Sequence, residues 1–308
     1  HFSVDPMMAK LCAAGQSFAL ASAVFDQFED RVEHGIRYSV RRHLLQYAMV
    51  GTISDMMEIG PGLNRAIVTA GLDELRSDPV PSLQALIAAV FKGADEKIGA
   101  TTISFGIGPA INSAGRFSNP EVAIGLLMAD DPGDADRLAA QLVELNDGRK
   151  QLQSDMLDEA MSVVDRDRSI AAYVGKDWEK GLVGLVASGM VDALHRPALA
   201  ATRLGEMIYG SGRSVPGFDL GRAVIEAHQA GLILGGGGHA AACGFQCAPE
   251  QWEAFVRFLE GERARADQGP TNHVDMVIDV TALTVDEVTE FARLAPYGQG
   301  WPQPIIGI

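Results

Sequence analysis

Apolar residues recur at helical spacing through much of the first part of the chain. Side chains three or four positions apart lie on one face of a helix, so such a stripe predicts a helix packed against a core. The pattern predicts helices over residues 11–33, 40–55, 64–75 and 120–129. Residues 106–115 are instead rich in glycine and predict an irregular loop.

The longest periodic segment follows the sequence Asp130 to Gly133. Its apolar residues keep spacings of three, four and seven: Leu138, Leu142, Leu145, Leu152, Met156 and Val163. Arg149 and Glu159 interrupt the stripe and argue against a long coiled coil. We therefore predict one helix of about 30 residues, too long for the interior of a small domain, that connects two domains.

Strands and helices alternate after this helix. The pattern predicts strands at residues 170–174, 198–202 and 206–209, and helices at 182–194 and 219–230. Such alternation is typical of an α/β domain. Further on, residues 274–280 alternate as a half-buried strand, and residues 284–294 form a helix in which Thr284 and Glu287 make a capping box. The predicted fold class is therefore α/β, in two domains joined by the long helix.

Composition supports a folded, two-domain chain. The length is 308 residues and 47% of them are hydrophobic, which is enough for two cores. No apolar run approaches the length of about 18 residues that a membrane span needs, so we expect no membrane partner. Cys12, Cys243 and Cys247 make neither a disulfide framework nor a zinc site, which favours a reducing cytoplasm. The chain opens with His1 rather than Met, which suggests a trimmed N-terminus.

The net charge of −15 disfavours general affinity for nucleic acid, because that affinity comes from clustered Lys and Arg. A local cationic groove on an acidic protein is nevertheless sufficient. The net charge is therefore compatible with a nuclease.

The strongest local signal is the glycine run at residues 235–238, followed by His239 and small residues up to Gly244. It suggests a loop that feeds a helix, whose exposed N–H groups bind an anion. His239 at the helix start would donate to a phosphate oxygen. The alternative is a glycine hinge before a helix that packs through its alanine face.

Two more glycine-containing segments carry side chains suited to phosphate. Residues 210–214 predict a sharp turn that presents Ser211, Arg213 and Ser214, although a surface salt bridge would also account for Arg213. Asn112 and Arg116 lie at the polar tip of the loop predicted at 106–115.

A single carboxylate, Asp55, follows the helix predicted at 40–55. Such a residue is ordinarily a helix cap or a surface residue. By itself it does not indicate a metal site.

Several stretches resemble, in order and spacing, the RecJ family of the DHH superfamily. They are Gly51 to Asp55 (GTISD) with Asn64-Arg65, Gly108 to Arg116 (GPAINSAGR), Leu145-Asn146 with Arg149, Trp178 to Ser188 with Arg196-Pro197, Gly210 to Leu220 (GSGRSVPGFDL), Gly236 to Phe245 (GGGHAAACGF) and Leu294 to Gly298 (LAPYG). The resemblance covers nearly the whole chain, and the two glycine-rich motifs together with INSAGR are its most specific parts.

The resemblance implies a domain organisation. Residues 1–130 would be the C-terminal part of a DHH catalytic domain and residues 131–165 the linking helix. Residues 166–262 would be a DHHA1 substrate-binding domain, and residues 263–308 a linker with the beginning of an OB-like domain.

It also implies an activity, namely hydrolysis of single-stranded DNA from 5′ to 3′ in repair and recombination, with two Mn²⁺ or Mg²⁺ ions. Asp55 would then be a catalytic metal ligand. The substrate would contact Asn112, Arg116, Ser211, Arg213, Ser214, Gly237, Gly238 and His239. The resemblance further predicts a cytoplasmic monomer with a single-strand-binding protein as a partner.

The sequence departs from the family pattern in its metal motifs. It has no Asp-His-His, and no Asp-x-Asp upstream of Asp55. Because Val4-Asp5-Pro6 resembles the stretch shortly after Asp-His-His, family order places these motifs before residue 1. Gly106 and Ala110 stand where the family has arginines, which weakens the expected phosphate contacts, and Cys243 replaces a usual alanine with little expected consequence.

Three rivals remain open. The first is a catalytically inactive DHH-fold protein that serves as a DNA-binding or replication scaffold. The second is a phosphodiesterase of short oligonucleotides, and the third is a metal-free nucleotide-sensing domain. The products of a nuclease digestion would separate them.

Overall fold

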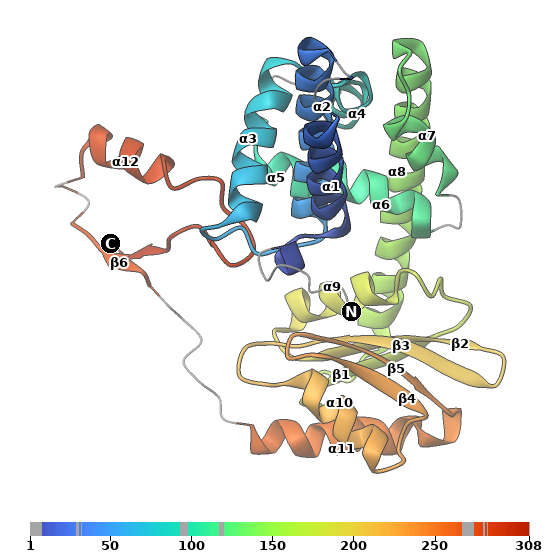
Figure 1. The fold of residues 1–308 in the computed structure, drawn as a ribbon. Helices are drawn as coiled ribbons and strands as arrows, with labels where there is room; N and C mark the ends of the chain where they lie inside the picture. The colour runs from blue at the N-terminus through green and yellow to red at the C-terminus, as the bar shows by residue number, and fades with distance from the viewer. Residues whose placement is uncertain are drawn as a thin grey trace. The chain divides into compact units, whose positions relative to one another are not determined.

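A computed structural model describes residues 8–28, 31, 33–92, 98–116, 120–266, 274–279, 281 and 283–307 (Figure 1). The chain divides into two compact units, His1–Asn146 with Val274–Ile308, and Asp147–His273. The predicted long helix is confirmed as α8 (Pro132–Val163), which has 32 residues and runs from the first unit into the second. The resemblance noted at Val4-Asp5-Pro6 lies outside the described residues.

The first unit is helical. Besides the first part of α8, its helices are η1 (Met8–Lys10), α1 (Ala13–Gln27), α2 (His34–Ser54), α3 (Leu63–Ser77), α4 (Pro81–Phe91), α5 (Ala100–Thr102), η3 (Ile103–Ile107), α6 (Gly108–Arg116), α7 (Glu121–Leu127) and α12 (Val285–Ala292). The predicted helices are present, but the first already ends at Gln27 and the second begins earlier than expected, at His34. Glycine allows α2 and α3 to approach closely, because a Cβ on Gly71 would lie 2.4 Å from the Cβ of Met49.

The loop predicted at 106–115 is wrong. This segment is the π-helix η3 followed directly by α6. Its fully buried apolar residues recur at spacings of three and four: Ile103, Ile107, Ala110 and Ala114. Burial of this stripe outweighs the low helix propensity of the glycines. Gly108 is needed for packing, since a Cβ there would lie 2.6 Å from the Oγ of Ser54 at the end of α2.

The C-terminal part of the first unit differs from its prediction in one element. The capping box of α12 is confirmed, with Thr284 and Glu287 each bonded to the backbone of the other. In the described part of the strand predicted at 274–280, residues 274–279, only β6 (Met276–Val277) forms, paired with β7 (Ile306–Gly307), and Val280 lies outside the described residues. Both β6 residues are exposed, so its apolar alternation has no core to bury and gives no extended strand.

The second unit is built on one mixed sheet. Its strands are β1 (Ala171–Gly175), β2 (Ala198–Leu204), β3 (Met207–Arg213), β4 (Gly235–His239) and β5 (Ala242–Cys247), in the order β1-β2-β3-β5-β4. The β1–β2 pair is parallel and the other pairs are antiparallel. The edge strand β4 therefore pairs on one side only, with β5. The predicted α/β class is confirmed.

Helices cover both faces of this sheet. Figure 1 shows α9 (Val183–Leu194) on one face and α10 (Leu220–Gln229) with α11 (Trp252–Arg265) on the other. The sequence of β2 matches this arrangement, because Ala198 and Ala200 pack into the core under α9 while Leu199 and Ala201 pack into the opposite core. A short 3-10 turn, η4 (Pro249–Gln251), leads into α11.

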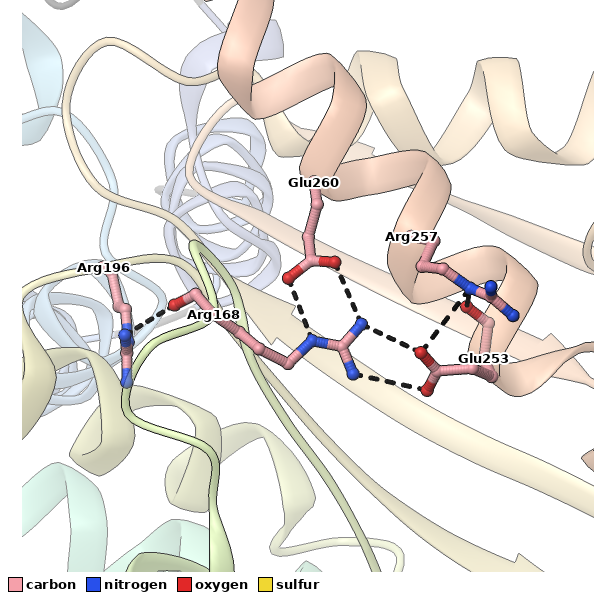
Figure 2. A network of polar contacts seen from close by, with 5 residues as sticks. All are labelled: Arg168, Arg196, Glu253, Arg257 and Glu260. Atoms are coloured by element: carbon pink, nitrogen blue, oxygen red, sulfur yellow. Dashed lines mark hydrogen bonds and ion pairs between the residues drawn. The ribbon is translucent and has the colours of Figure 1, made fainter.

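An ion-pair network fixes α11 to the segment before β1 (Figure 2). Arg168 lies between Glu260, at 2.9 Å, and Glu253, at 3.1 Å. The hydrogen bonds that the Arg168 guanidinium donates to these two carboxylates raise its pKa above the ordinary value. The Arg196 guanidinium donates to the backbone oxygen of Arg168, so the network also holds the turn before β2.

Among the described residues, no helix is both long enough and apolar enough to cross a membrane.

Candidate functional site

The glycine-rich segment 235–244 does not feed a helix, so that prediction is wrong. It forms the β4–β5 hairpin. The reason lies in β5, where Cys243, Phe245 and Cys247 are buried and alternate with less buried residues, which is the period of a strand. His239 is consequently the last residue of β4, and its side chain is exposed.

Residues 210–213 also form strand, in β3, rather than the predicted turn. Gly210 leaves room for the core, because a Cβ there would lie 2.1 Å from the Cζ of Phe245. A Cβ on Gly212 would lie 2.8 Å from side-chain atoms of Leu220. Since a strand alternates its two faces, Ser211 and Arg213 project from the opposite face, on the side of α9.

Ser211 and Arg213 contact each other at the start of α9. The Nη1 of Arg213 donates to the Oγ of Ser211 at 3.0 Å and to the carbonyl of Gly212 at 2.9 Å. The Ser211 hydroxyl donates in turn to the carbonyl of Cys243 at 2.9 Å. A Cβ on Gly184, in the first turn of α9, would lie 3.0 Å from the Nη2 of Arg213. The guanidinium therefore lies beside the positive end of a helix dipole, an arrangement that an anion would stabilise.

A surface without side chains adjoins this pair. In the sheet register, Ser211 is opposite Gly244 and Gly244 is opposite Gly237, so the three residues form one row on the α9 side. A Cβ on Gly237 would meet no atom within 4 Å, and one on Gly244 would meet only a carbonyl oxygen at 4.0 Å. We call Gly235, Gly237 and Gly244 the glycine floor. It leaves the backbone open to a ligand of extended shape.

The next row of the sheet brings Arg213, Ala242 and His239 to the same face. Arg213 and His239 thus come from separate motifs and lie two strands apart. Gly238 faces the other way, where a Cβ would lie 2.1 Å from the carbonyl oxygen of Ala242. Of the two predicted glycines, only Gly237 belongs to the open surface.

Ser214 follows β3 and stabilises the hairpin. Its N–H donates to the carbonyl of Ala241 at 2.9 Å, and its hydroxyl donates to the carbonyl of Phe218 at 2.7 Å. The hydroxyl proton is therefore engaged within the turn, while the oxygen can still accept a hydrogen bond.

Cys243 lies under this surface as a neutral thiol. Burial raises its pKa to about 12, and the nearby backbone of Gly212 and charge of Arg213 lower it only partly. A thiol in this state is neither a nucleophile nor a metal ligand near neutral pH.

The predicted residues of the first unit lie at the end of α2 and along α6. Asp55 is the C-cap of α2, and its side chain is exposed. Gly108 packs against Ser54 beside it, and Asn112 and Arg116 follow at intervals of four on α6. Asn112 is exposed and Arg116 half-buried. These two residues were expected on a loop and instead project from a helix.

The described residues do not complete a metal centre. No group of three or more His, Cys, Asp and Glu that could hold a metal ion is found in the part of the chain that the structure describes. Asp55 can therefore supply one ligand, and the structure assigns it no companions.

Sequence reasoning missed Lys180 and Tyr209, whose side chains contact each other next to the glycine floor. Tyr209 could have been found from alternation alone. If the strand predicted at 206–209 is extended through Arg213, Tyr209 falls on the same face as Ser211.

Comparison with known proteins identifies the class of the second unit. Residues 167–263 match the family model described as the DHHA1 domain. The matched segment includes the sheet that carries the Ser211–Arg213 pair and the glycine floor, so this part of the second unit is similar to a DHHA1 domain.

The chain as a whole is RecJ-like in sequence and fold. It is 30% identical to the single-stranded-DNA-specific exonuclease RecJ of Bacillus subtilis over 96% of this chain and 37% of that protein. It is 28% identical to RecJ of Escherichia coli, over 96% of this chain and 54% of that protein. The crystal structure of RecJ with Mn²⁺ from Thermus thermophilus has a TM-score of 0.75 at 29% identity, covering 85% of this chain and 39% of that one.

The chain thus spans between 37% and 54% of the length of these two curated relatives. The RecJ structures from Thermus thermophilus are complexes with Mg²⁺ and with Mn²⁺.

Proposed function

We propose that this protein is a metal-dependent exonuclease that hydrolyses single-stranded DNA from its 5′ end and acts in DNA repair and recombination. The observation that carries the proposal is the pairing of Ser211 with Arg213 at the start of α9, beside the glycine floor. RecJ proteins are named as single-stranded-DNA-specific exonucleases. The similarity to them supports single-stranded DNA as the substrate and exonucleolytic cleavage as the reaction.

The second unit would hold the phosphates of the strand. A guanidinium presents a planar set of donors that matches two phosphate oxygens at once. The contact with Ser211 orients Arg213, so little side-chain freedom remains to be lost when a phosphate binds. The glycine floor would let the sugar–phosphate backbone lie directly on β4 and β5, with His239 as a further donor at its end.

Asp55 is the residue that we assign to a divalent ion, Mn²⁺ or Mg²⁺, by the match of GTISD to the family motif. Two such ions are expected. Because the described residues do not complete the site, we derive no catalytic step through the metal. Asn112 and Arg116 are assigned to substrate contact on α6, whose first residue packs against Ser54, next to Asp55 in the chain. We further expect a monomer that binds a single-strand-binding protein.

The test is digestion of a long single-stranded DNA by the protein as encoded, with Mn²⁺ and a label on the 5′-terminal nucleotide. We expect the label to leave at once as a mononucleotide, and blunt duplex to remain intact. Late release of the label would overturn the proposed 5′-to-3′ direction of digestion.

Activity confined to very short oligonucleotides would instead favour a phosphodiesterase of small substrates. Binding of the strand without hydrolysis would favour a DNA-binding or replication scaffold.

A further inference from the structure

A lysine and a tyrosine form a contact next to the glycine floor. The Nζ of Lys180 lies 4.0 Å from the centroid of the Tyr209 ring. Lys180 belongs to the segment between β1 and α9, whereas Tyr209 belongs to β3. Lys180 is exposed and Tyr209 half-buried. An ammonium held over an aromatic face keeps its outward N–H donors available to a second partner.

The register of the sheet places this pair in line with the phosphate site. Tyr209, Ser211 and Arg213 alternate along β3 and so share the α9 face. Tyr209 is opposite Gln246, and Gln246 is opposite Gly235. Gly235 of the glycine floor lies in this row, where a Cβ would meet no atom within 4 Å, and the side chain of Gln246 projects from the same face between Gly235 and Tyr209. The row lies two residues, or about 6.8 Å, along the strand from the row of Ser211.

The segment that carries Lys180 is anchored two residues earlier. Trp178 is 5% exposed, and its ring covers Gly175, where a Cβ would lie 2.0 Å from a ring atom. Its Nε1 donates to Glu159 at 3.0 Å, and Tyr173 donates to the other oxygen of Glu159 at 2.8 Å. Lys180 therefore projects from an ordered turn, so a ligand does not have to order the main chain there.

We propose that Lys180, positioned by Tyr209, binds a second phosphodiester group of a strand that lies on the glycine floor with another phosphate at Ser211 and Arg213. The subsite rests on the proposed function, because it needs a polymer with successive phosphates. A ligand with a single phosphate would contact Arg213 but not Lys180. A strand would span both rows of the sheet.

The test compares a polymer with a monomer. Binding of a ten-residue oligothymidylate to the full chain is measured by fluorescence anisotropy over a range of salt concentrations, and binding of thymidine 5′-monophosphate by calorimetry. For Lys180→Gln we expect the slope of log K against log salt to become shallower by about 0.7, the value for one phosphate contact on a single strand. Affinity for the monophosphate should not change.

Two further variants identify the role of each residue. Lys176→Gln removes the same charge from the same segment and should leave the slope unchanged. Tyr209→Phe keeps the ring and should bind like the wild type, whereas Tyr209→Leu should reproduce the loss seen for Lys180→Gln. That pattern would distinguish a positioned lysine from a general effect of charge.

Equal losses for Lys176→Gln and Lys180→Gln, or normal binding by Tyr209→Leu, would overturn the subsite. If the wild type binds the oligonucleotide and Lys180→Gln binds it equally well, the subsite is wrong while the proposed function stands. If the wild type shows no salt-dependent binding of the strand, both proposals are wrong.

Discussion

Arg213 donates through Nη1 to the hydroxyl of Ser211, two residues earlier on the same strand, at 3.0 Å. The two side chains share a face because residues two apart in a strand point the same way. Gly210 and Gly212, on either side of Ser211, face the opposite core, where a Cβ would clash. The Ser211 hydroxyl also donates to the carbonyl of Cys243 on β5. Through Ser211 the guanidinium is thereby tied to β5, the strand that carries Gly244 of the glycine floor.

Arg213→Lys should weaken binding of single-stranded DNA by one to two orders of magnitude. Lysine keeps the charge but loses the planar donor set, and a hydrogen bond to a charged group contributes about 1.5–3 kcal/mol. Anisotropy titrations at fixed salt measure the effect. Arg203→Lys is the matched control, because Arg203 is an exposed arginine of the same sheet, paired with Glu206 at 3.7 Å. Equal losses in both variants would contradict the assignment of Arg213.

Gly237→Ala and Gly238→Ala should separate binding from stability. The new methyl group at position 237 would meet no atom within 4 Å, so we expect a normal unfolding midpoint with weaker strand binding. At position 238 it would lie 2.1 Å from the Ala242 oxygen, and we expect destabilisation of about 1–3 kcal/mol. Urea unfolding and the same binding titration measure both. Normal binding by Gly237→Ala would show that no ligand lies on the floor there.

Arg65→Ala should release the segment around Leu294 to Trp301 from α3. Arg65 donates to the backbone oxygens of Leu294, at 2.7 Å, and Pro296, at 3.2 Å, and its guanidinium lies 5.1 Å from the centroid of the Trp301 ring. We expect faster hydrogen exchange at the amide of Trp301, which bonds to Gly298.

Arg76→Ala, on the same helix, is the control for this experiment and should leave those amides protected. Unchanged exchange in Arg65→Ala would mean that other contacts suffice to hold the segment.

Cys243 should make the stability of the second unit fall at alkaline pH. Burial raises its pKa in the folded state to about 12, from an ordinary value of 9.0. A raised folded pKa means that the stability is fully present below pH 9 and is lost progressively up to pH 12, as the unfolded thiol ionises first.

The comparison is with Cys243→Ala. Between pH 9 and 10 the wild type should lose about 1 kcal/mol more than this variant, as measured by urea unfolding. Parallel pH profiles for the two proteins would show that Cys243 is not buried as a neutral thiol.

The elements that could be predicted from sequence are those whose own residues carry the periodic signal. The helix Pro132–Val163 follows from its apolar stripe, and the capping box at Thr284 and Glu287 from local chemistry. The side chains suited to phosphate, Ser211 and Arg213, were also evident from residue type, as were the motifs that resemble RecJ.

The glycine-rich segments were decided by tertiary structure. A glycine has no side chain to report which face is buried, so its sequence pattern does not distinguish loop, helix and strand. Residues 210–213 are strand because Gly210 leaves space for Phe245, and Gly108 is helical because it leaves space for Ser54. The atoms that fill those spaces come from distant parts of the chain. The sequence by itself therefore determined which chemical groups are available, and only the packing of those distant neighbours determined which groups share a face.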